Sequence, residues 1–384
     1  MTERLYYKDC YLTRFDAKVV DANPERTLVY LDRTAFYPSS GGQPFDLGLL
    51  GEVAITEVVD EDDRVAHKLS SPLRGDVVSG TIDWQRRFDH MQQHTGQHLL
   101  SAVFVEVLHA ATLSFHLGAE SCAIDLGLPA IDSAQVQAVE RRANELVLEN
   151  RPVTVDFQHS SEATDLRKPS DREGELRIVS IHELDRSACG GTHVRSTGEI
   201  GPILIRKLEK MRGNVRVEFL CGMRAVRRAR ADYQALAQIA RLFSAPLDQA
   251  PALVAAQLEK ALEADKVRRR MGTELATARG RELCRATAED AQGMRKTVRR
   301  VDSISDELRA EAQSFAAGSK AAILILAENP PSALVAVSND SGINAGQWLK
   351  TALAQVGGRG GGSAAIAQGS VPSSHLLQHL ADAF

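Results

Sequence analysis

Two pairs of metal-binding side chains, far apart in the sequence, constrain the fold of this chain most strongly. His94 and His98 form an H-x-x-x-H motif in a segment predicted to be helical. Residues four apart lie on one face of a helix, so both imidazoles can bind one ion. Much later comes Cys189-Gly-Gly-Thr-His193, where two glycines favour a tight turn. Imidazoles and a thiolate form a nitrogen and sulfur donor set that suits Zn²⁺.

A fold that uses these residues must bring segments 94–98 and 189–193 together in space. The zincin protease motif has a glutamate directly after its first histidine, and Thr95 stands at that position. A metalloprotease is therefore disfavoured. His90 precedes His94 by one helical turn, and it is an alternative ligand, a substrate contact or an exposed side chain.

Composition limits the class of protein. The 384 residues are too many for one ordinary core and predict several domains. With 43% apolar and 25% charged residues, the chain has the balance of a soluble globular protein. We expect no membrane span, since no apolar run is long enough, and no signal peptide. Five dispersed cysteines predict a reducing, cytoplasmic environment. The net charge of −4 means that an RNA partner needs local basic patches.

The patterning predicts an α+β protein with four regions. Short β-rich segments predict a small β-barrel over residues 1–82. Residues 34–46, rich in glycine, proline and serine, interrupt these strands as an ordinary hairpin loop or a functional loop. A metal-binding α/β domain is expected over 83–222, a coiled-coil-like helical spacer over 223–301, and a small α/β domain over 302–384.

Periodicity and breaker residues predict the individual elements. Helices are expected over 85–108, 133–149, 225–243, 252–279, 306–316 and 343–356, and strands over 215–219, 321–326, 333–337 and 364–367. Pro246 and Pro251 separate the third and fourth helices, which predicts a helical hairpin or a short coiled coil.

These motifs carry a family resemblance. His94-Thr-Gly-Gln-His98 with Cys189-Gly-Gly-Thr-His193 resembles the zinc signature of the editing domain of alanyl-tRNA synthetase and of the freestanding alanyl-tRNA editing proteins. Residues 34–44 resemble the loop of the family's N-terminal barrel, 211–219 the strand that closes the editing domain, and 357–362 part of a DHHA1-type domain. The resemblance covers nearly the whole chain and leaves no room for an aminoacylation domain. It therefore implies the long freestanding form, which acts in trans.

The resemblance implies a deacylase that hydrolyses the ester of mischarged Ser-tRNA(Ala), with Gly-tRNA(Ala) as a further substrate. One Zn²⁺ would be held by His94, His98, Cys189 and His193. These ligands fill a tetrahedron, so the ion either exchanges a loose ligand for water or positions the tRNA 3′ end while water is held elsewhere. We favour the second, and a purely structural zinc is the third alternative.

The same resemblance suggests pocket residues. Thr34 is expected to contact the hydroxyl of a misacylated serine, because a pocket that hydrogen-bonds this hydroxyl rejects alanine. Gly41 and Gly42 would let the backbone approach the terminal adenosine. His116 stands where synthetases usually have glutamine, and is expected to be a general base, an orienting donor or a pocket wall. Gln97 is expected to support the ligands.

Basic residues and glycines supply candidate tRNA contacts. The candidates are Arg212, Arg216, Arg268, Arg269, Arg359 and Gly360. Backbone N–H groups of the cluster 357–362 could cradle a phosphate, although the cluster fits neither the P-loop nor the dinucleotide-binding motif. A second copy of the chain, paired through the spacer or the C-terminal domain, is the other partner considered.

Two other functions compete with editing. One is a tRNA-binding or dimerisation module whose zinc is structural. The other is a DHHA1-linked nucleotide phosphoesterase of the DHH type. That enzyme would require an Asp-His-His cluster, and the sequence contains none.

Overall fold

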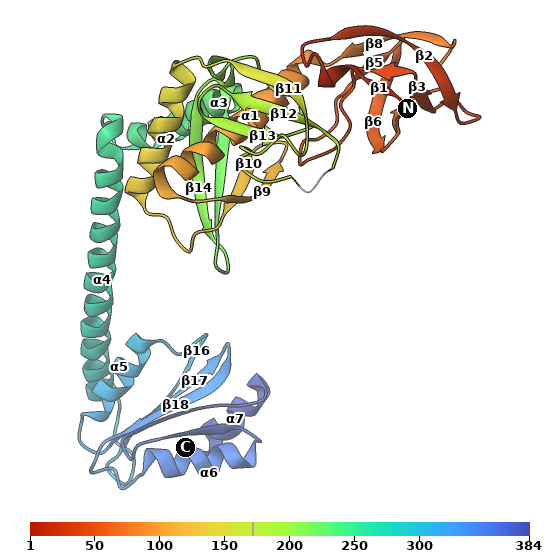
Figure 1. Ribbon diagram of the computed structural model, residues 1–384. Coiled ribbons are helices and arrows are strands. Elements are labelled where there is room, and N and C mark those ends of the chain that lie inside the picture. Colours follow the sequence, from red (N-terminus) through yellow and green to blue (C-terminus); the bar gives the residue numbers. More distant parts are fainter. Residues whose placement is uncertain (171–172) are drawn as a thin grey trace. The chain divides into compact units, whose positions relative to one another are not determined.

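The computed structural model describes residues 1–170 and 173–384, which form two compact units, Met1–Gln238 and Ile239–Phe384 (Figure 1). Both units mix helices with sheets, so the expected α+β class is confirmed. In this described part of the chain, no helix is both long enough and apolar enough to span a membrane.

The first unit begins with a closed β-barrel. Its strands are β2 (Arg14–Ala22), β3 (Leu28–Leu31), β5 (Gly48–Leu50), β6 (Val53–Glu61), β7 (Arg64–Leu69) and β8 (Val77–Ile82), in the order β2-β3-β7-β6-β5-β8. The short strands β1 (Glu3–Arg4) and β4 (Arg33–Thr34) pair in parallel outside it. Alternate side chains such as Val29, Leu31 and Val58 fill the interior, as the period of two in a strand requires.

The rest of the first unit surrounds one buried helix, α1 (Trp84–Leu108). The other elements are β9 (Thr112–Leu117), β10 (Cys122–Leu126), α2 (Ser133–Leu148), β11 (Val153–His159), β12 (Glu175–Ile181), β13 (Asp185–Ala188), β14 (Ile203–Lys210) and β15 (Val215–Cys221). They form an antiparallel sheet, β14-β15-β10-β9, and a smaller one, β11-β12-β13.

Local signals explain where the two helices begin. The Asp83 side chain accepts a hydrogen bond from the Arg86 N–H and so caps α1. Asp132 forms a reciprocal capping box with Gln135 at the start of α2, close to the boundary expected there. Leu100, Phe104 and their neighbours on α1 join the core formed by the four-stranded sheet and α2. Because α1 is covered on nearly all sides, the polar residues along its middle are buried as well.

The long helices connect the first unit with the second. Helix α3 (Gly222–Leu242) crosses the boundary between the units, and α4 (Ala250–Ala286) has 37 residues. The second unit also contains β16 (Arg295–Val301), α5 (Asp306–Ala316), β17 (Ala321–Glu328), β18 (Pro331–Val337), α6 (Ala345–Gln355), β19 (Arg359–Gly362), β20 (Ile366–Ser370) and α7 (Leu377–Ala383). The helix that α4 packs against is α5, where Gly280 leaves room for the backbone of Glu311.

The second unit is a sheet covered on both faces. Its five strands follow the order β16-β17-β18-β20-β19. Leu324 and Leu326 of β17 join the core with α6 and α7, whereas Ile323 and Ile325 join the core with α5. Figure 1 shows α6 and α7 on one side of this sheet and α5 on the other. The continuous apolar run of β17 therefore reflects burial on both faces.

Two features of the second unit differ from the expectations. Residues 295–301, expected in the spacer, form β16 and pair in parallel with β17, so the boundary expected at 301 falls inside the sheet. No strand was expected within the glycine cluster, but residues 359–362 form β19 and pair with β20. Glycine is needed there for close packing, since a Cβ on Gly360 would lie 2.5 Å from the Gly369 Cα.

Candidate metal centre

The four expected ligands lie together in the first unit. His94 and His98 come from α1, Cys189 directly follows β13, and His193 lies in the loop after it. Their ligand atoms all lie within 4.8 Å of one another. Within residues 1–170 and 173–384, this is the one cluster of three or more His, Cys, Asp or Glu side chains arranged to hold a metal ion.

The separations suit tetrahedral coordination. Cys189 Sγ lies 3.5 Å from His94 Nε2 and 3.3 Å from His193 Nε2. With typical zinc bonds of about 2.3 Å to sulfur and about 2.0 Å to nitrogen, a tetrahedral S–N edge is about 3.5 Å. The donor set and the spacing therefore fit a zinc-like ion.

Each imidazole forms a hydrogen bond through its outer nitrogen with a different polar group. His94 Nδ1 lies 2.9 Å from Gln43 Oε1, His98 Nδ1 lies 3.0 Å from Asp185 Oδ2, and His193 Nδ1 lies 3.1 Å from Thr95 Oγ1. A proton on each Nδ1 leaves each Nε2 with a free lone pair toward the cluster. This arrangement is the one that a metal bound through Nε2 requires.

A buried polar network holds these acceptors and the cysteine loop. Asp185 accepts hydrogen bonds from Arg167 Nε at 2.6 Å and from Ser187 Oγ at 2.9 Å. Arg177 donates to the carbonyl of Cys189 at 2.6 Å and to that of Gly191 at 3.0 Å. These partners are themselves held in place, so the hydrogen bonds to the ligands have fixed directions.

The charges also favour metal binding. Burial opposes ionisation of the Cys189 thiol, but the nearby imidazoles of His94 and His193 lower its pKa well below the ordinary value. Burial also opposes charge on His98, yet hydrogen bonds to Asp185 and Cys189 raise its pKa to about 9. Burial lowers the pKa of His193 to about 3. These shifts favour a thiolate at Cys189, the form of cysteine that binds metal ions.

Gly191 permits the close approach of the cysteine loop to α1. A Cβ at this position would lie 2.2 Å from His94 Cε1 and 3.1 Å from Gln43 Oε1. The neighbouring Gly190 has more space, since its Cβ would lie 3.5 Å from Tyr7 Oη. The expected reason for the glycine pair was a tight turn, and the structure adds the space that a side chain at 191 would occupy.

Thr34, on the short strand β4, contacts the barrel strand β7 and has no exposed surface. Its Oγ1 is 2.9 Å from His67 Nε2 and accepts a hydrogen bond from the Phe36 N–H at 3.1 Å. This placement differs from the expectation of a contact with the serine hydroxyl, because the threonine hydroxyl is already engaged by these two residues.

Gly41 and Gly42 belong to the loop that reaches the cluster. Both have positive φ angles, 55° and 83°. A Cβ on Gly42 would lie 3.0 Å from the carbonyl oxygen of Phe115, whose ring centroid is 5.4 Å from that of His94. This glycine therefore lets the barrel loop pack against the backbone of β9 beside the metal ligands.

His116 lies on the sheet face opposite to Phe115, since successive strand residues alternate. Its Nε2 is 3.3 Å from Ser114 Oγ, and its side chain is 59% exposed beside Asp125. Arg216 forms two hydrogen bonds with Asp125, at 2.7 and 2.9 Å, which lower the pKa of this carboxyl to about 2. The structure therefore does not bring His116 to the cluster, in contrast to the expected pocket role.

Gln97 and His90 are buried on α1 but do not contact the ligand atoms through hydrogen bonds. Gln97 Nε2 donates to Ser101 Oγ at 2.8 Å, on the side of the helix toward β9. Burial, together with the charge of Arg86, lowers the pKa of His90 to about 4, and its Nδ1 has no hydrogen-bond partner. His90 is therefore a buried neutral side chain rather than an exposed one or a member of the cluster.

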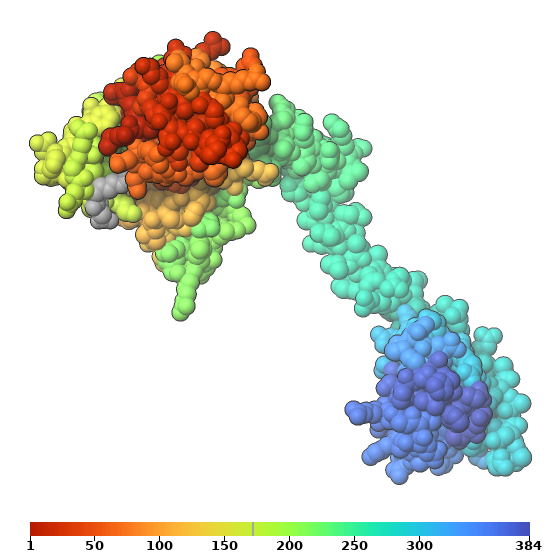
Figure 2. Space-filling model, turned by 90° about the vertical axis from the view of Figure 1, so that its right-hand side faces the viewer, coloured from red at the N-terminus to blue at the C-terminus, as the bar shows by residue number. Residues whose placement is uncertain are grey.

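The candidate tRNA contacts fall into two groups. Arg212 lies in the turn between β14 and β15, a hairpin whose light-green tip projects from the first unit in Figure 2, and Arg359 and Gly360 are exposed on β19. Arg216 is paired with Asp125, and Arg268 and Arg269 with Asp265. Arg212, Arg359 and Gly360 are therefore more accessible to phosphate than the arginines that are paired with aspartates.

Four residues that position the ligands were missed from the sequence: Gln43, Thr95, Arg177 and Asp185. Gln43 directly follows the glycine pair, and Asp185 precedes Cys189 by four residues. Both residues lie next to motifs that the sequence analysis identified. However, no spacing rule predicts which imidazole of another segment an amide or a carboxylate will contact.

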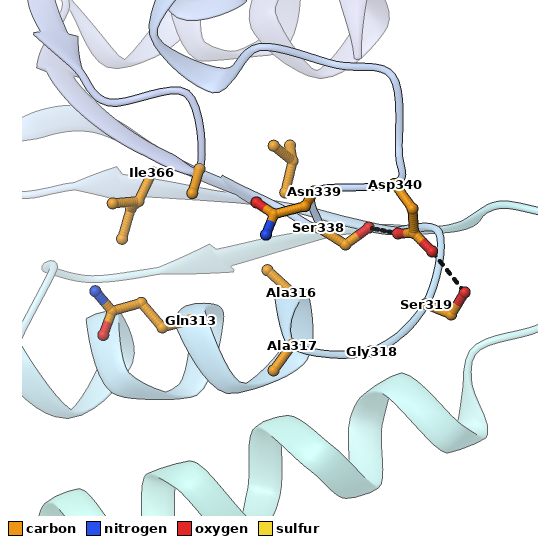
Figure 3. A pocket seen from close by; sticks show the side chains of 11 residues that line it. Gln313, Ala316, Ala317, Gly318, Ser319, Ser338, Asn339, Asp340 and Ile366 are labelled. Carbon is orange, nitrogen blue, oxygen red and sulfur yellow. Dashed lines mark hydrogen bonds between the residues drawn. The ribbon is translucent and has the colours of Figure 1, made fainter.

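The second unit has a separate hollow of about 510 Å³, between the end of α5, the end of β18 and the start of β20 (Figure 3). Its one carboxylate, Asp340, accepts hydrogen bonds from Ser319 Oγ at 2.7 Å, the Lys320 N–H at 2.8 Å and Ser338 Oγ at 2.6 Å. Asp340 thus connects two loops through hydrogen bonds. The residues that line the hollow include no histidine or cysteine.

Comparisons with known proteins identify the family. The Threonyl and Alanyl tRNA synthetase second additional domain matches residues 176–218, which include Cys189 and His193, and the DHHA1 domain matches residues 294–384. The alanyl-tRNA editing protein AlaX-L of Pyrococcus horikoshii is 31% identical over 394 residues, which cover 97% of this chain and 95% of that protein. This chain belongs to the AlaX-L family of alanyl-tRNA editing proteins.

This chain also resembles part of a larger enzyme. The alanine–tRNA ligases of Pyrococcus furiosus and Halorubrum lacusprofundi are 33% and 34% identical to this chain, and the alignments cover 96% and 100% of it. The chain spans about two fifths of the length of these ligases, since the alignments cover 42% and 43% of them. The family resemblance expected from the motifs is therefore confirmed along nearly the whole chain.

Proposed function

We propose that this editing protein hydrolyses the ester bond of Ser-tRNA(Ala), with Gly-tRNA(Ala) as a second substrate. The observation that supports this most strongly is the cluster of His94, His98, Cys189 and His193, whose three imidazoles all present Nε2 to one point. The relative that matches over almost its full length is named as an alanyl-tRNA editing protein. An aminoacyl ester is already activated, so positioning and charge stabilisation are sufficient catalytic tasks.

We propose Zn²⁺ as the ion. When bound, it would supply a positive charge that attracts an oxygen or nitrogen of the aminoacylated 3′ end. The protein's own task is orientation. Gln43, Asp185 and Thr95 hold the imidazoles, while Cys189 is the one ligand with appreciable exposure. Because four side chains fill a tetrahedron, a positioning role for the ion is favoured over activation of a water.

The proposal also includes the domain boundaries and the residues that contact the tRNA. We propose a barrel over residues 1–82, an editing domain over 83–222, a helical spacer that ends before β16, and a DHHA1-like domain beyond it. Arg212 and Arg359 are proposed to contact phosphates, because both are exposed, Arg212 in the turn between β14 and β15 and Arg359 on the edge strand β19. Dimerisation through the spacer or the C-terminal domain remains a separate proposal.

Of the two competing functions, the phosphoesterase is the weaker. It would require a cluster of acidic and histidine ligands in or near the DHHA1-like domain, and the hollow there contains Asp340 as its one carboxylate. A tRNA-binding module with a structural zinc accounts for the same ligands. It differs from the editing proposal only in predicting no deacylation.

Release of serine from purified Ser-tRNA(Ala) tests the proposal. We expect the zinc-loaded chain to release serine and Cys189→Ala to lose roughly 100-fold or more of this activity. Cys284→Ala, which alters a buried cysteine of the second unit, is the matched control. A folded, zinc-loaded chain that releases no serine would contradict the editing function and support the binding module.

A further inference from the structure

The segment 35–46 links the barrel to the helix that carries the metal ligands. It contacts α1 around Arg86 and Arg87, and again at His94. Arg87 and His94 lie seven residues apart and so on the same face, two turns away from each other. The barrel loop is therefore attached to α1 at both ends of this stretch, and one of the attachments is a candidate metal ligand.

The first contact is a fully buried ion pair. Arg87 and Asp46 have no exposed surface, and Arg87 Nε lies 3.0 Å from both Asp46 oxygens. Arg87 also donates to the carbonyls of Cys10 at 2.9 Å and Ala35 at 2.6 Å. With each charged group satisfied by several partners, this end of the loop is rigidly attached to α1.

The second contact is the amide of Gln43, which is 1% exposed. Its Oε1 lies 2.9 Å from His94 Nδ1 and accepts a hydrogen bond from the Thr192 N–H at 3.1 Å. Its Nε2 donates to Thr192 Oγ1 at 2.8 Å. A backbone N–H is always a donor, so the amide atom that it meets must be the oxygen, and His94 must carry its proton on Nδ1.

We propose that Gln43 is a positioning residue of the metal centre, and that it couples docking of the barrel loop to metal binding. Through Gln43, the loop selects the His94 tautomer that leaves Nε2 free for the ion. By thermodynamic reciprocity, an ion that prefers this tautomer also strengthens the attachment of the loop. The proposal rests on the metal-binding part of the proposed function and is independent of which ester is hydrolysed.

Three variants test it by zinc affinity, measured in competition with a chelating dye. We expect Gln43→Ala to bind Zn²⁺ about 10- to 100-fold more weakly, the usual effect of removing a partner of a ligating imidazole. Gln43→Glu should restore the affinity, because a carboxylate also accepts from His94 Nδ1 and from the Thr192 N–H. Gln92→Ala is the matched control, since this buried glutamine of α1 donates to the Glu199 carbonyl.

Hydrogen exchange gives a second readout that loss of packing alone would not produce. Addition of Zn²⁺ should slow exchange over residues 35–46 in the unaltered chain and in Gln92→Ala, and should do so less in Gln43→Ala. Unchanged zinc affinity and unchanged zinc-dependent protection in Gln43→Ala would overturn the proposal, while serine release by that variant would leave the editing function standing. Failure of the unaltered chain to bind Zn²⁺ would overturn both.

Discussion

The three imidazoles of the metal centre share one orientation but are held by three different chemical groups. An amide oxygen from the barrel loop and a carboxylate from β13 accept hydrogen bonds from His94 Nδ1 and His98 Nδ1, and a hydroxyl from α1 is hydrogen-bonded to His193 Nδ1. The ligands themselves were predictable from two short motifs. Their partners were not, because the choice among amide, carboxylate and hydroxyl depends on what the fold places within hydrogen-bond distance.

At the residue scale, the burial of His67 predicts that acid lowers the stability of the barrel. This histidine is fully buried, and burial lowers its pKa from 6.5 to about 4. Between these values the unfolded chain binds a proton that the native barrel does not, so stability is present above pH 6.5 and is lost as the pH falls toward 4. We expect His67 alone to contribute about 3 kcal/mol to the loss of unfolding free energy across this range, measured by urea unfolding of the metal-free chain and of a variant that lacks this histidine.

The variant His67→Gln isolates this effect, since glutamine can still bond to the Thr34 hydroxyl but does not titrate. Its unfolding free energy should vary less with pH than that of the unaltered chain. His90, whose pKa is also lowered to about 4, contributes equally to both proteins and cancels in the comparison. Parallel pH profiles of the two proteins would contradict the prediction.

At the scale of elements, the cysteine loop shows why two adjacent glycines differ. A methyl group at 191 would collide with His94, whereas one at 190 would make an ordinary contact with Tyr7. We expect Gly191→Ala to weaken zinc binding at least about tenfold, because His94 or the loop must move. Gly190→Ala should stay within about twofold, and equal losses in the two variants would show that the turn conformation, rather than space at His94, requires glycine.

Strand β19 supports a similar paired test in the second unit. A Cβ on Gly360 would lie 2.7 Å from the Gln368 carbonyl oxygen, whereas nothing lies within 4 Å of one on Gly361. Gly360→Ala should therefore lower the unfolding free energy of this unit by about 1–3 kcal/mol. Gly361→Ala should change it by less than about 0.5 kcal/mol. If both were neutral in urea unfolding, residues 359–362 would not be packed as a strand.

Strand alternation also explains the placement of His116. The motif-based expectation placed it in the pocket, but one step along β9 reverses the face of the sheet. Phe115 meets His94, and His116 meets Asp125 and Arg216 on the other side. Which of these two residues faces the metal centre depends on how β9 is oriented in its sheet, and the sequence of one short strand does not reveal this orientation.

At the scale of the whole molecule, the division into two units predicts two unfolding transitions. All four metal ligands lie in Met1–Gln238. With free Zn²⁺ at about 100 times its Kd, binding stabilises this unit by about 2.7 kcal/mol, or about 5–10 °C in Tm. In calorimetry, a chelator should lower one transition by this amount and leave that of Ile239–Phe384 unchanged. Equal shifts of both transitions would show that the units unfold together.

The sequence alone determined most elements of this protein and the identity of its candidate metal ligands. Helix α1, helix α5 and the ligand quartet follow from periodicity, caps and spacing, which act over a few neighbouring residues. Tertiary structure alone decided that Gln43 and Asp185 orient the imidazoles, that Thr34 is buried against the barrel strand β7 and that β16 joins the second sheet. These outcomes depend on contacts between distant segments, where packing and hydrogen bonding select partners that local pattern does not specify.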